Sequence, residues 1–442
     1  MIMRHIKWVT LAVVVAATTV MAQDPAATAP ASTPASASAP ALASVDWRPT
    51  VASAPAPASA PAKAWDVSTV EQLRQALKQC GPGDQVVLAP GRYFLEQPIF
   101  VTQPRVVVRG RTGRPEDVVL HGGGMNNPEG GQNGVHLAAH GVQLRDLTVR
   151  DFYQYGVLTS GREPCRFLPD GLVLSNLRIE DCGTRHIKGV NNRDTSDAAL
   201  IERVQFRQTQ PRQSRPGHPV DPDNYIGGID AMRTRDWIIR DCRFEGIRGA
   251  TGGGRGAIFL WIGSANPLIE RNVFVDCAAA ICLGNGHNPD RVYHVTGGVV
   301  RNNVVRHRSG WRAIELGFVR DLQFVHNTIY SNSGEGDDGE GRTVDCYDGR
   351  DLPAVNVQIR NNLIRGRVAN RARGQVLVAD NVTGPVVTAD WFEGPDAALL
   401  RLTPKAERAI DRCPPLEAAP LDFDGRRRPA EGKVDAGAFE RP

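Results

Sequence analysis

Short stretches that alternate apolar and polar residues recur along this chain, and asparagine follows many of them. Four copies align directly, at residues 268–277, 299–307, 322–332 and 357–366. The alignment places four asparagines in one column, namely Asn272, Asn303, Asn327 and Asn362. The column extends to Val204, Cys242 and Asn381, while Asn176 falls in it or one residue off. A column of this length predicts a repeated structural unit.

The spacing of the column restricts which repeat fold is possible. From Val204 to Asn362 the intervals are 38, 30, 31, 24 and 35 residues. A period near 30 with uneven loops is too long for a hexapeptide solenoid and too irregular for propeller blades. It favours a coil of three short strands per turn, each stacking on its copy in the next turn. We therefore predict an all-β right-handed parallel β-helix of roughly ten coils, with stacked asparagines at one bend.

A second strand recurs in every turn and defines one face of the predicted coil. Its middle apolar residue should point inward, which applies to Ile187, Ile229, Ile258, Ile281, Ile314 and Val344. Because side chains alternate along a strand, the next residue should point outward. The expected exposed ladder is Lys188, Asp230, Phe259, Cys282, Glu315 and Asp345, preceded by His136 and Leu158 in earlier turns.

The two ends of the chain differ from the repeat. Residues 1–22 have the basic start, apolar run and small-residue cleavage site of a secretory signal peptide. Residues 23–64 are mainly Ala, Pro, Ser and Thr, which predicts a disordered linker. We expect the β-helix over 65–420, with a helix capped near Ser68 covering its first coil, and a C-terminal capping segment over 421–442.

Charge and cysteine content narrow the classes of partner. The formal net charge is +4, and the basic residues are scattered, so no nucleic-acid partner is expected. No membrane association is expected once the signal peptide is cleaved. We expect a secreted or periplasmic monomer. The eight cysteines fit no zinc-site spacing, which favours buried free thiols.

The segment 67–95 and the tail 421–440 carry a family resemblance. The first is similar to the start of secreted β-helix proteins of the pectate-lyase-like superfamily, especially the chondroitinase B/alginate lyase type. The resemblance implies a polysaccharide substrate, a lysine base, an arginine acid, and calcium held by Asn and Glu. Those lyases carry Asn-Lys-Ser at the base, where this chain has Ile187-Lys188-Gly189. We assign no metal ligand and no certain cofactor; calcium is the cofactor that the resemblance allows.

Lys188 is the first candidate for catalysis, because it is the only lysine between Lys78 and Lys405. A lysine with a lowered pKa can abstract a proton during β-elimination of a uronic acid, which arginine does less readily. We place His186 on the same face as a helper, and Asp230 as a residue that positions Lys188, binds a metal or donates a proton. The structural alternative is a simple Lys188–Asp230 ion pair between adjacent strands.

Other residues of this face are candidates for binding substrate. Arg233 and Arg312 would bind carboxylates, Trp261 would stack on a sugar ring, and Glu315 would contact the glycan. Long insertions at 207–227 and 333–341 would wall the site. Polysaccharide lyase activity is the leading hypothesis. The alternatives are a glycoside hydrolase using Glu315 and Asp345, and a non-catalytic glycan-binding surface protein.

Overall fold

The computed structural model describes residues 63–159, 169–189, 195–288, 291–331 and 342–441. All of these belong to one compact unit, which lies within Trp47–Pro442. The predicted signal peptide, nearly all of the predicted linker and the 333–341 insertion fall outside the described residues. None of the helices in the described part is both long and apolar enough to cross a membrane.

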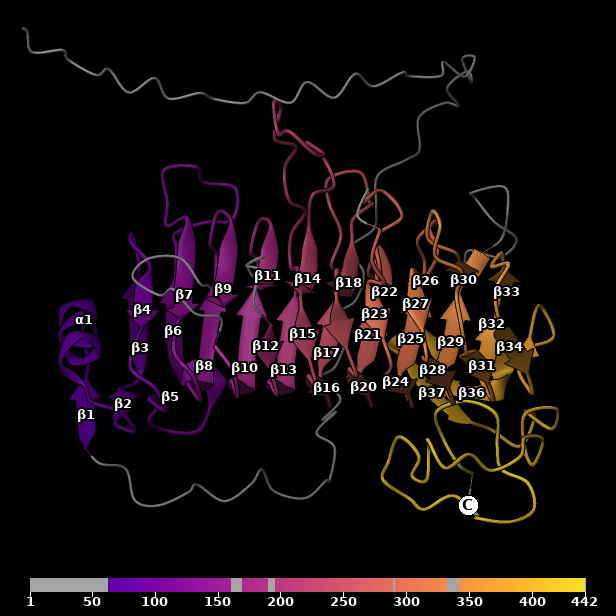
Figure 1. The fold of residues 1–442 in the computed structure, drawn as a ribbon. Coiled ribbons are helices and arrows are strands. Elements are labelled where there is room, and N and C mark those ends of the chain that lie inside the picture. The colour runs from indigo at the N-terminus through magenta and orange to yellow at the C-terminus, as the bar shows by residue number, and fades with distance from the viewer. Residues whose placement is uncertain (1–62, 160–168, 190–194, 289–290, 332–341, 442) are drawn as a thin grey trace, which may run out of the picture. The chain divides into compact units, whose positions relative to one another are not determined.

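The described chain is wound into successive coils whose strands pair in parallel with those of the next coil (Figure 1). The longest sheet has 20 strands. The members are β1 (Ala64–Val67), β2 (Gln85–Leu88), β3 (Gly91–Phe94), β5 (Val107–Gly110), β6 (Val118–His121), β8 (Gln143–Arg150), β10 (Val173–Glu180), β13 (Leu200–Arg207), β16 (Ile238–Arg240), β17 (Arg243–Glu245), β20 (Leu268–Glu270), β21 (Val273–Val275), β24 (Val299–Arg301), β25 (Val304–His307), β28 (Gln323–Val325), β29 (Thr328–Ser331), β31 (Val357–Arg360), β32 (Leu363–Arg365), β34 (Val376–Ala379) and β35 (Val382–Thr383). Three of these strands, β8, β10 and β13, run through one bend of the coil without interruption. In the coils after β13, this bend separates two shorter strands.

A ten-stranded sheet contributes one strand per coil, which confirms the prediction of a right-handed parallel β-helix with roughly ten coils. In coil order its strands are β4 (Ile99–Val101), β7 (Asn133–Leu137), β9 (Tyr155–Thr159), β11 (Arg185–Gly189), β14 (Gly227–Met232), β18 (Gly256–Trp261), β22 (Ala279–Leu283), β26 (Ile314–Gly317), β30 (Arg342–Tyr347) and β33 (Arg367–Asn370). A third sheet consists of β12 (Ser196–Asp197), β15 (Thr234–Arg235), β19 (Ser264–Ala265), β23 (Val295–Thr296) and β27 (Val319–Arg320).

The interior of the coil is filled by side chains that stack in register from one turn to the next. Phe206, Phe244 and Phe274 form such a column, with ring centroids 4.4 and 4.9 Å apart and nearly parallel planes. The seven described cysteines are also buried and unpaired, as predicted, at positions 80, 182, 242, 277, 282, 346 and 413. Burial of this continuous apolar column is the main force that holds successive coils together.

The asparagine column is confirmed as a buried hydrogen-bonded ladder. Each Oδ1 accepts both the backbone N–H and the side-chain Nδ2–H of the asparagine one coil earlier. This pattern joins Asn272, Asn303, Asn327, Asn362 and Asn381 at 2.8–3.1 Å. The backbone N–H of Cys242 donates to Asn272 at 3.0 Å and begins the ladder.

The residue before each member of this column has a left-handed backbone, which makes the bend. The residues concerned are Asp146, Asn176, Arg203, Asp241, Arg271, Asn302, His326, Asn361 and Asp380, with φ between 51° and 58°. Leu177 pairs with Val204, so Asn176 lies one residue before the column. Asn and Asp tolerate this conformation better than most residues, which explains why so many occur here.

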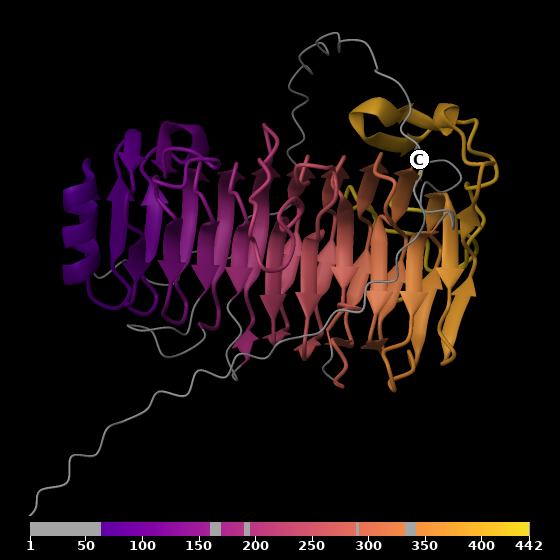
Figure 2. The ribbon, with the colours of Figure 1, turned by 90° about the horizontal axis from the view of Figure 1, so that it is seen from above.

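Helix α1 (Val70–Gln79) is capped near Ser68, as predicted. Thr69 is its N-cap, because its side chain accepts a hydrogen bond from the N–H of Gln72 at 3.2 Å. Leu73, Ala76 and Leu77 form the buried side of the helix. Figure 2 shows α1 stacked beside the first strands at one end of the coil, where it covers apolar surface.

The C-terminal segment 421–441 contacts the side of the last coils. The bend residues Asn302, His326 and Asn361 contact it in three successive coils, through the carbonyls of Leu421 and Gly437 and the N–H of Gly437. An apolar cluster joins it to β25, β29 and β32. The remaining elements are the antiparallel pair β36 (Phe392–Gly394) and β37 (Leu399–Leu402) and the short 3-10 helices Pro115–Asp117, Ala389–Trp391 and Pro395–Ala397.

Candidate functional site

The outward ladder on the ten-stranded sheet has the predicted register. Lys188 pairs with Asp230, Asp230 with Phe259, and the order continues through Cys282, Glu315 and Asp345. The predicted inward residues of these strands are all fully buried. The expectation that the ladder is exposed is wrong, because Asp230, Glu315 and Asp345 are each at most 2% exposed. Neighbouring arginines and loops cover them.

Four side chains on adjacent strands form what we call the Lys188 cluster: Arg185, Lys188, Asp230 and Trp261. Asp230 accepts from Lys188 Nζ at 2.9 Å and from Trp261 Nε1 at 3.1 Å through Oδ1. Its Oδ2 accepts from Arg185 Nε at 2.8 Å. Asp230 therefore accepts from three donors on the two neighbouring strands β11 and β18, and the predicted Lys188–Asp230 pair is present.

Burial and neighbouring charges both act on the pKa values of Asp230 and Lys188. Burial would raise the pKa of Asp230, but the charges of Lys188 and Arg185 and their hydrogen bonds lower it to about 2. Burial lowers the pKa of Lys188; Asp230 opposes that change and Arg185 adds to it. Asp230 is therefore a carboxylate at neutral pH, and Lys188 loses its proton more readily than a solvated lysine does.

The prediction that His186 lies on the face of Lys188 is wrong. His186 is fully buried, and its ring nitrogens lie 3.3 Å from the carbonyl oxygen of Gly227 and 3.2 Å from that of Arg207. Its ring meets the core residue Phe206 edge-on. His186 is therefore a core residue and contributes no polar atom to the Lys188 cluster.

A recurring irregularity in the strand explains the orientation of His186. In β11 the paired residues are 185, 187 and 188, so His186 is skipped in the register. The same place in neighbouring strands holds small buried residues: Gly134, Gly156, Gly228, Ala257, Ala280 and Ala313. Two consecutive residues face inward at this corner, and strict alternation fails there. The same break turns Arg185 outward, where sequence alternation would have buried it in the core.

Trp261 and Arg233 occupy different surroundings. Trp261 is half-buried, and its ring stacks on Phe259 with centroids 5.0 Å apart, so one of its faces is already covered. Arg233 lies in the turn after β14, where its left-handed backbone donates to the carbonyl of Ile262 at 3.0 Å. Its Nε is buried without a hydrogen-bond partner. The structure therefore brings Trp261, but not Arg233, to the Lys188 cluster.

A second group on the same sheet, the Glu315 cluster, consists of Arg255, Arg312, Glu315, Asp345, Tyr347 and Arg371. Arg312 donates to Glu315 and to Asp345, each at 3.2 Å. Arg371 donates twice to Asp345 at 2.8 Å, and the Tyr347 hydroxyl donates to Glu315. Burial would raise the pKa of Glu315, but Arg255 and Arg312 lower it overall. A glycosidase acid needs a raised pKa, so this pair is poorly suited to hydrolysis.

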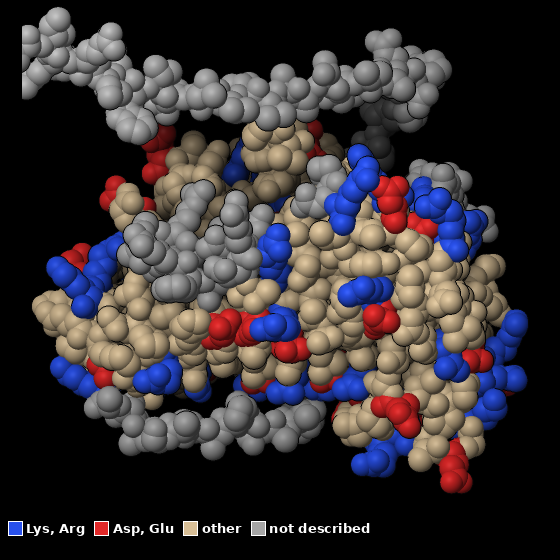
Figure 3. All heavy atoms as spheres, viewed as in Figure 1, with Lys and Arg blue, Asp and Glu red and all other residues tan. Residues whose placement is uncertain are grey.

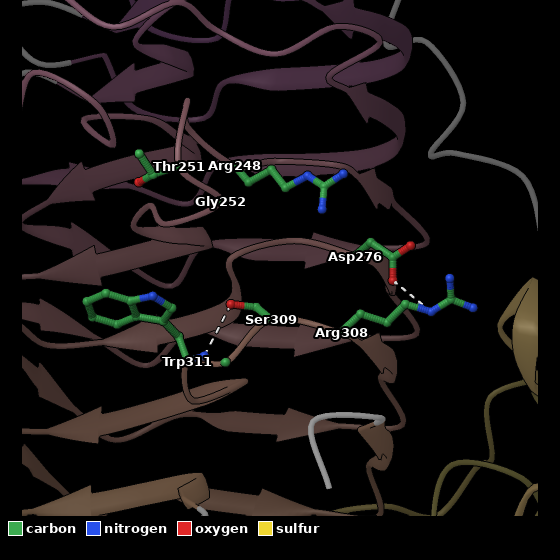
Figure 4. A pocket seen from close by; sticks show the side chains of 8 residues that line it. Arg248, Thr251, Gly252, Asp276, Arg308, Ser309 and Trp311 are labelled. Carbon is green, nitrogen blue, oxygen red and sulfur yellow. Dashed lines mark hydrogen bonds and ion pairs between the residues drawn. The ribbon is translucent and has the colours of Figure 1, made fainter. Parts of the chain in front are cut away.

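A cavity of about 490 Å³ lies beside this sheet, between the loops that precede β18 and β26. Its lining includes Arg248, Thr251, Asp276, Arg308 and Trp311 (Figure 4). The Trp311 residue is 61% exposed, which is unusual for so large an apolar group. Trp311 was not among the predicted site residues, although a tryptophan beside Gly310 in a loop before the ladder strand is a recognisable signal.

The 207–227 insertion walls the Lys188 cluster, as predicted. Tyr225 lies under the guanidinium of Arg185 at 4.2 Å from the ring centre.

In Figure 3 acidic and basic side chains lie close together on the face shown, which agrees with the modest net charge. The 333–341 insertion lies outside the described residues.

The clusters fit calcium poorly. Within the described ranges, no three His, Cys, Asp or Glu side chains gather in a group that could hold a metal ion. Both oxygens of Asp230 already accept from cations, and the carboxylates of Glu315 and Asp345 accept from arginines. Calcium requires six to eight oxygen ligands. We therefore derive no step that uses calcium.

Several solved structures are similar to this chain. Pectate lyase Pel9A is 13% identical, with a TM-score of 0.50 over 87% of this chain and 97% of its own. An alginate lyase from Paenibacillus sp. str. FPU-7 is 16% identical, with a TM-score of 0.37 over 73% and 98%. The Streptococcus pneumoniae surface protein and adhesin PfbA is 13% identical, with a TM-score of 0.47 over 71% and 93%.

At these identities the likeness extends to the fold alone, and the set contains both lyases and an adhesin. No curated protein is similar enough in sequence to match. Residues 126–370 match the family described as right handed beta helix region. Because that match spans more than half of the sequence and agrees with the observed coil, the chain belongs to the right-handed β-helix family.

Proposed function

We propose that this protein is a polysaccharide lyase that cleaves an acidic glycan by β-elimination, with Lys188 as the base. The observation that carries the proposal is the placement of Lys188: its side chain is 13% exposed, and burial lowers its pKa. A base must be able to lose its proton, and partial burial favours the neutral amine. The fold likeness to pectate lyase Pel9A is consistent with this activity.

In the proposed reaction, neutral Lys188 Nζ takes the proton from carbon 5 of a uronic acid unit. The electrons of the C–H bond form a double bond between carbons 4 and 5 while the bond from carbon 4 to the leaving oxygen breaks. The leaving oxygen then takes the proton from the Lys188 ammonium. Asp230 holds Nζ at 2.9 Å and, with a pKa of about 2, positions the base rather than acting as one.

Arg185 supports the amine form of Lys188. It shares the carboxylate of Asp230, and its positive charge disfavours a second cation beside it. Trp261 donates to the same oxygen that accepts from Lys188 and thereby competes for it. Both contacts weaken the hold of Asp230 on the protonated lysine.

The experiment measures the ultraviolet absorbance of unsaturated sugar ends on a panel of uronic-acid polymers. We expect wild type and the control Lys78→Ala, at an exposed position of α1, to produce the signal, and Lys188→Ala to lose it. Release of reducing ends without that absorbance would show that the protein cleaves the glycan by hydrolysis and not by elimination. Equal activity of the Lys188→Ala variant would remove Lys188 from the mechanism.

A second candidate is glycan binding without cleavage, and Trp311 supports it. Trp311 lines the same cavity as Arg248 and Arg308, and aromatic and basic groups together are what acidic sugars use. Binding of a polymer that yields no product, and loss of that binding in Trp311→Ala, would favour this candidate. Export to the periplasm or medium and a monomeric state are part of either proposal.

A further inference from the structure

Arg212, in the 207–227 insertion, carries a buried cation without a partner. The residue is 1% exposed, yet its Nε, Nη1 and Nη2 atoms make no hydrogen bond. Burial, with the charges of Arg215 and Arg185, lowers its pKa to about 10, so it stays charged at neutral pH. Burying an unpaired charge is strongly unfavourable. A buried arginine without a hydrogen-bond acceptor therefore indicates that a ligand supplies the missing acceptor.

Arg215 adds a second charge beside Arg212, and its own partners are neutral. Its Nη2 donates to the carbonyl oxygens of Met125 at 3.0 Å and Tyr153 at 2.5 Å. Its Nη1 donates to the hydroxyl of Thr184 at 3.3 Å, and its guanidinium lies 3.7 Å from the centre of the Tyr153 ring. These contacts hold Arg215 in place while leaving its charge uncompensated.

The balance of charge around Arg212 is positive. Asp230 serves both Arg185 and Lys188, so it compensates only one of them. Asp221 is the acid that acts on Arg212, and its Oδ1 already accepts the backbone N–H groups of residues 223 and 224. Among the described groups that act on Arg212, two arginines thus oppose one carboxylate. An anion entering here would be attracted by this excess.

We propose that the 207–227 insertion covers an anion-binding site, in which Arg212 receives one carboxylate or sulfate group of an acidic glycan. Its planar guanidinium suits a two-point contact with either group. The inference rests on the proposed function for its ligand, and it assigns to Arg212 the substrate contact that the sequence analysis gave to Arg233. Entry of the anion requires the insertion to move away from Asn126, which holds Pro211 and Gln213.

The first test is thermal unfolding in chloride, sulfate and galacturonate at matched ionic strength. We compare wild type, Arg212→Met, which keeps most of the volume without the charge, and Arg350→Gln at an exposed control position. Sulfate or galacturonate should raise the Tm of wild type and of the control. Arg212→Met should be at least as stable as wild type in chloride and should gain less than wild type from both anions, because only the general effect of sulfate on folded proteins remains. A wild type that gains nothing, or an Arg212→Met variant that gains as much, overturns the site.

The second test is the affinity for a uronic-acid oligosaccharide, measured by titration calorimetry. Arg212→Met should bind about 10- to 100-fold more weakly, as expected for losing a charged hydrogen-bonding pair. The control should stay within about twofold of wild type, since surface changes seldom matter. An Arg212→Met variant that also binds within twofold overturns the site. Binding in wild type without unsaturated product would remove the elimination mechanism and leave the anion site standing.

Discussion

The Lys188 and Glu315 clusters lie on one sheet and differ in how their carboxylates are compensated. Around Lys188 a single carboxylate serves two cations, and one of them is a lysine. Around Glu315 two carboxylates are enclosed by arginines and by the Tyr347 hydroxyl. Arginine keeps its proton under nearly all conditions, whereas a buried lysine can release it. One scaffold thus presents a cluster that can exchange a proton and another that serves as a static ion-pair network.

The largest expected effect separates the two clusters by activity. Lys188→Ala should reduce kcat/KM roughly 100- to 10,000-fold, the range for loss of a general base. Glu315→Gln keeps the shape of the side chain and should stay within about threefold of wild type, since Glu315 belongs to the other cluster and does not contact the reacting atoms. Initial rates of unsaturated product measure both variants. Comparable losses of kcat/KM in the two variants would show that both clusters take part in the reaction.

The next largest effect concerns stability. Asp230→Asn leaves Arg185 and Lys188 without their carboxylate and should lower the free energy of unfolding by about 3–5 kcal/mol. Glu315→Gln should cost less, about 1–3 kcal/mol, because Asp345 still accepts from Arg312. Urea unfolding followed by circular dichroism measures the difference. A greater loss for Glu315→Gln would reverse the comparison.

The Asp230 change also has a pH signature. The folded pKa of about 2 is below the ordinary 3.8, so the ionised form contributes stability that is complete above about pH 4. That contribution is lost as the pH falls through about 2. The variant lacks it, so the gap between wild type and Asp230→Asn should narrow across this window. A gap that stays constant from pH 5 to pH 2 would contradict the assignment.

A third prediction extends the comparison to His136, two coils before Lys188 on the same ladder. Burial lowers the pKa of His136 to about 4, and its ring packs 4.5 Å from that of Phe100. The neutral ring therefore contributes stability that is complete above pH 6.5 and lost as the pH falls through about 4. His136→Phe should flatten the stability profile between these values. The exposed control His287→Gln should leave the profile unchanged.

The smallest predicted effect probes the link between Trp261 and Asp230. Trp261→Phe removes one hydrogen bond to a carboxylate and should cost about 1–2 kcal/mol. Because the competing donor is lost, Asp230 should hold the ammonium form more strongly, so the pH dependence of kcat should shift to higher pH. The pH–rate profile of the variant, beside that of Trp311→Phe, measures this shift. A shift to lower pH would show that Trp261 does not act through Asp230.

The register of the ladder was predictable because strand alternation and coil stacking are both periodic. Lys188 beside Asp230 and Glu315 beside Asp345 follow from those two periods. His186 escaped the prediction because the skipped residue at the strand corner interrupts the alternation. This interruption shows only in the pairing of β11 with its neighbours, where residue 186 has no partner.

The burial of the ladder was not predictable for a different reason. It depends on side chains that reach across coils, such as Arg371 over Asp345, and on the path of a long insertion. Neither is periodic, and neither leaves a local signal in the sequence. Arg212 illustrates the limit: its residue type is ordinary, and only its missing partners make it a candidate.

The asparagine ladder begins at Cys242 and continues to Asn381, so only the later coils have it. In the earlier coils the same column consists of Leu147, Leu177 and Val204, and its contacts are apolar. Apolar attraction weakens on cooling. We therefore expect cold to loosen the early coils first, including those that carry Lys188 and Asp230. The protein should respond to low temperature as two halves, although its strands form one continuous coil.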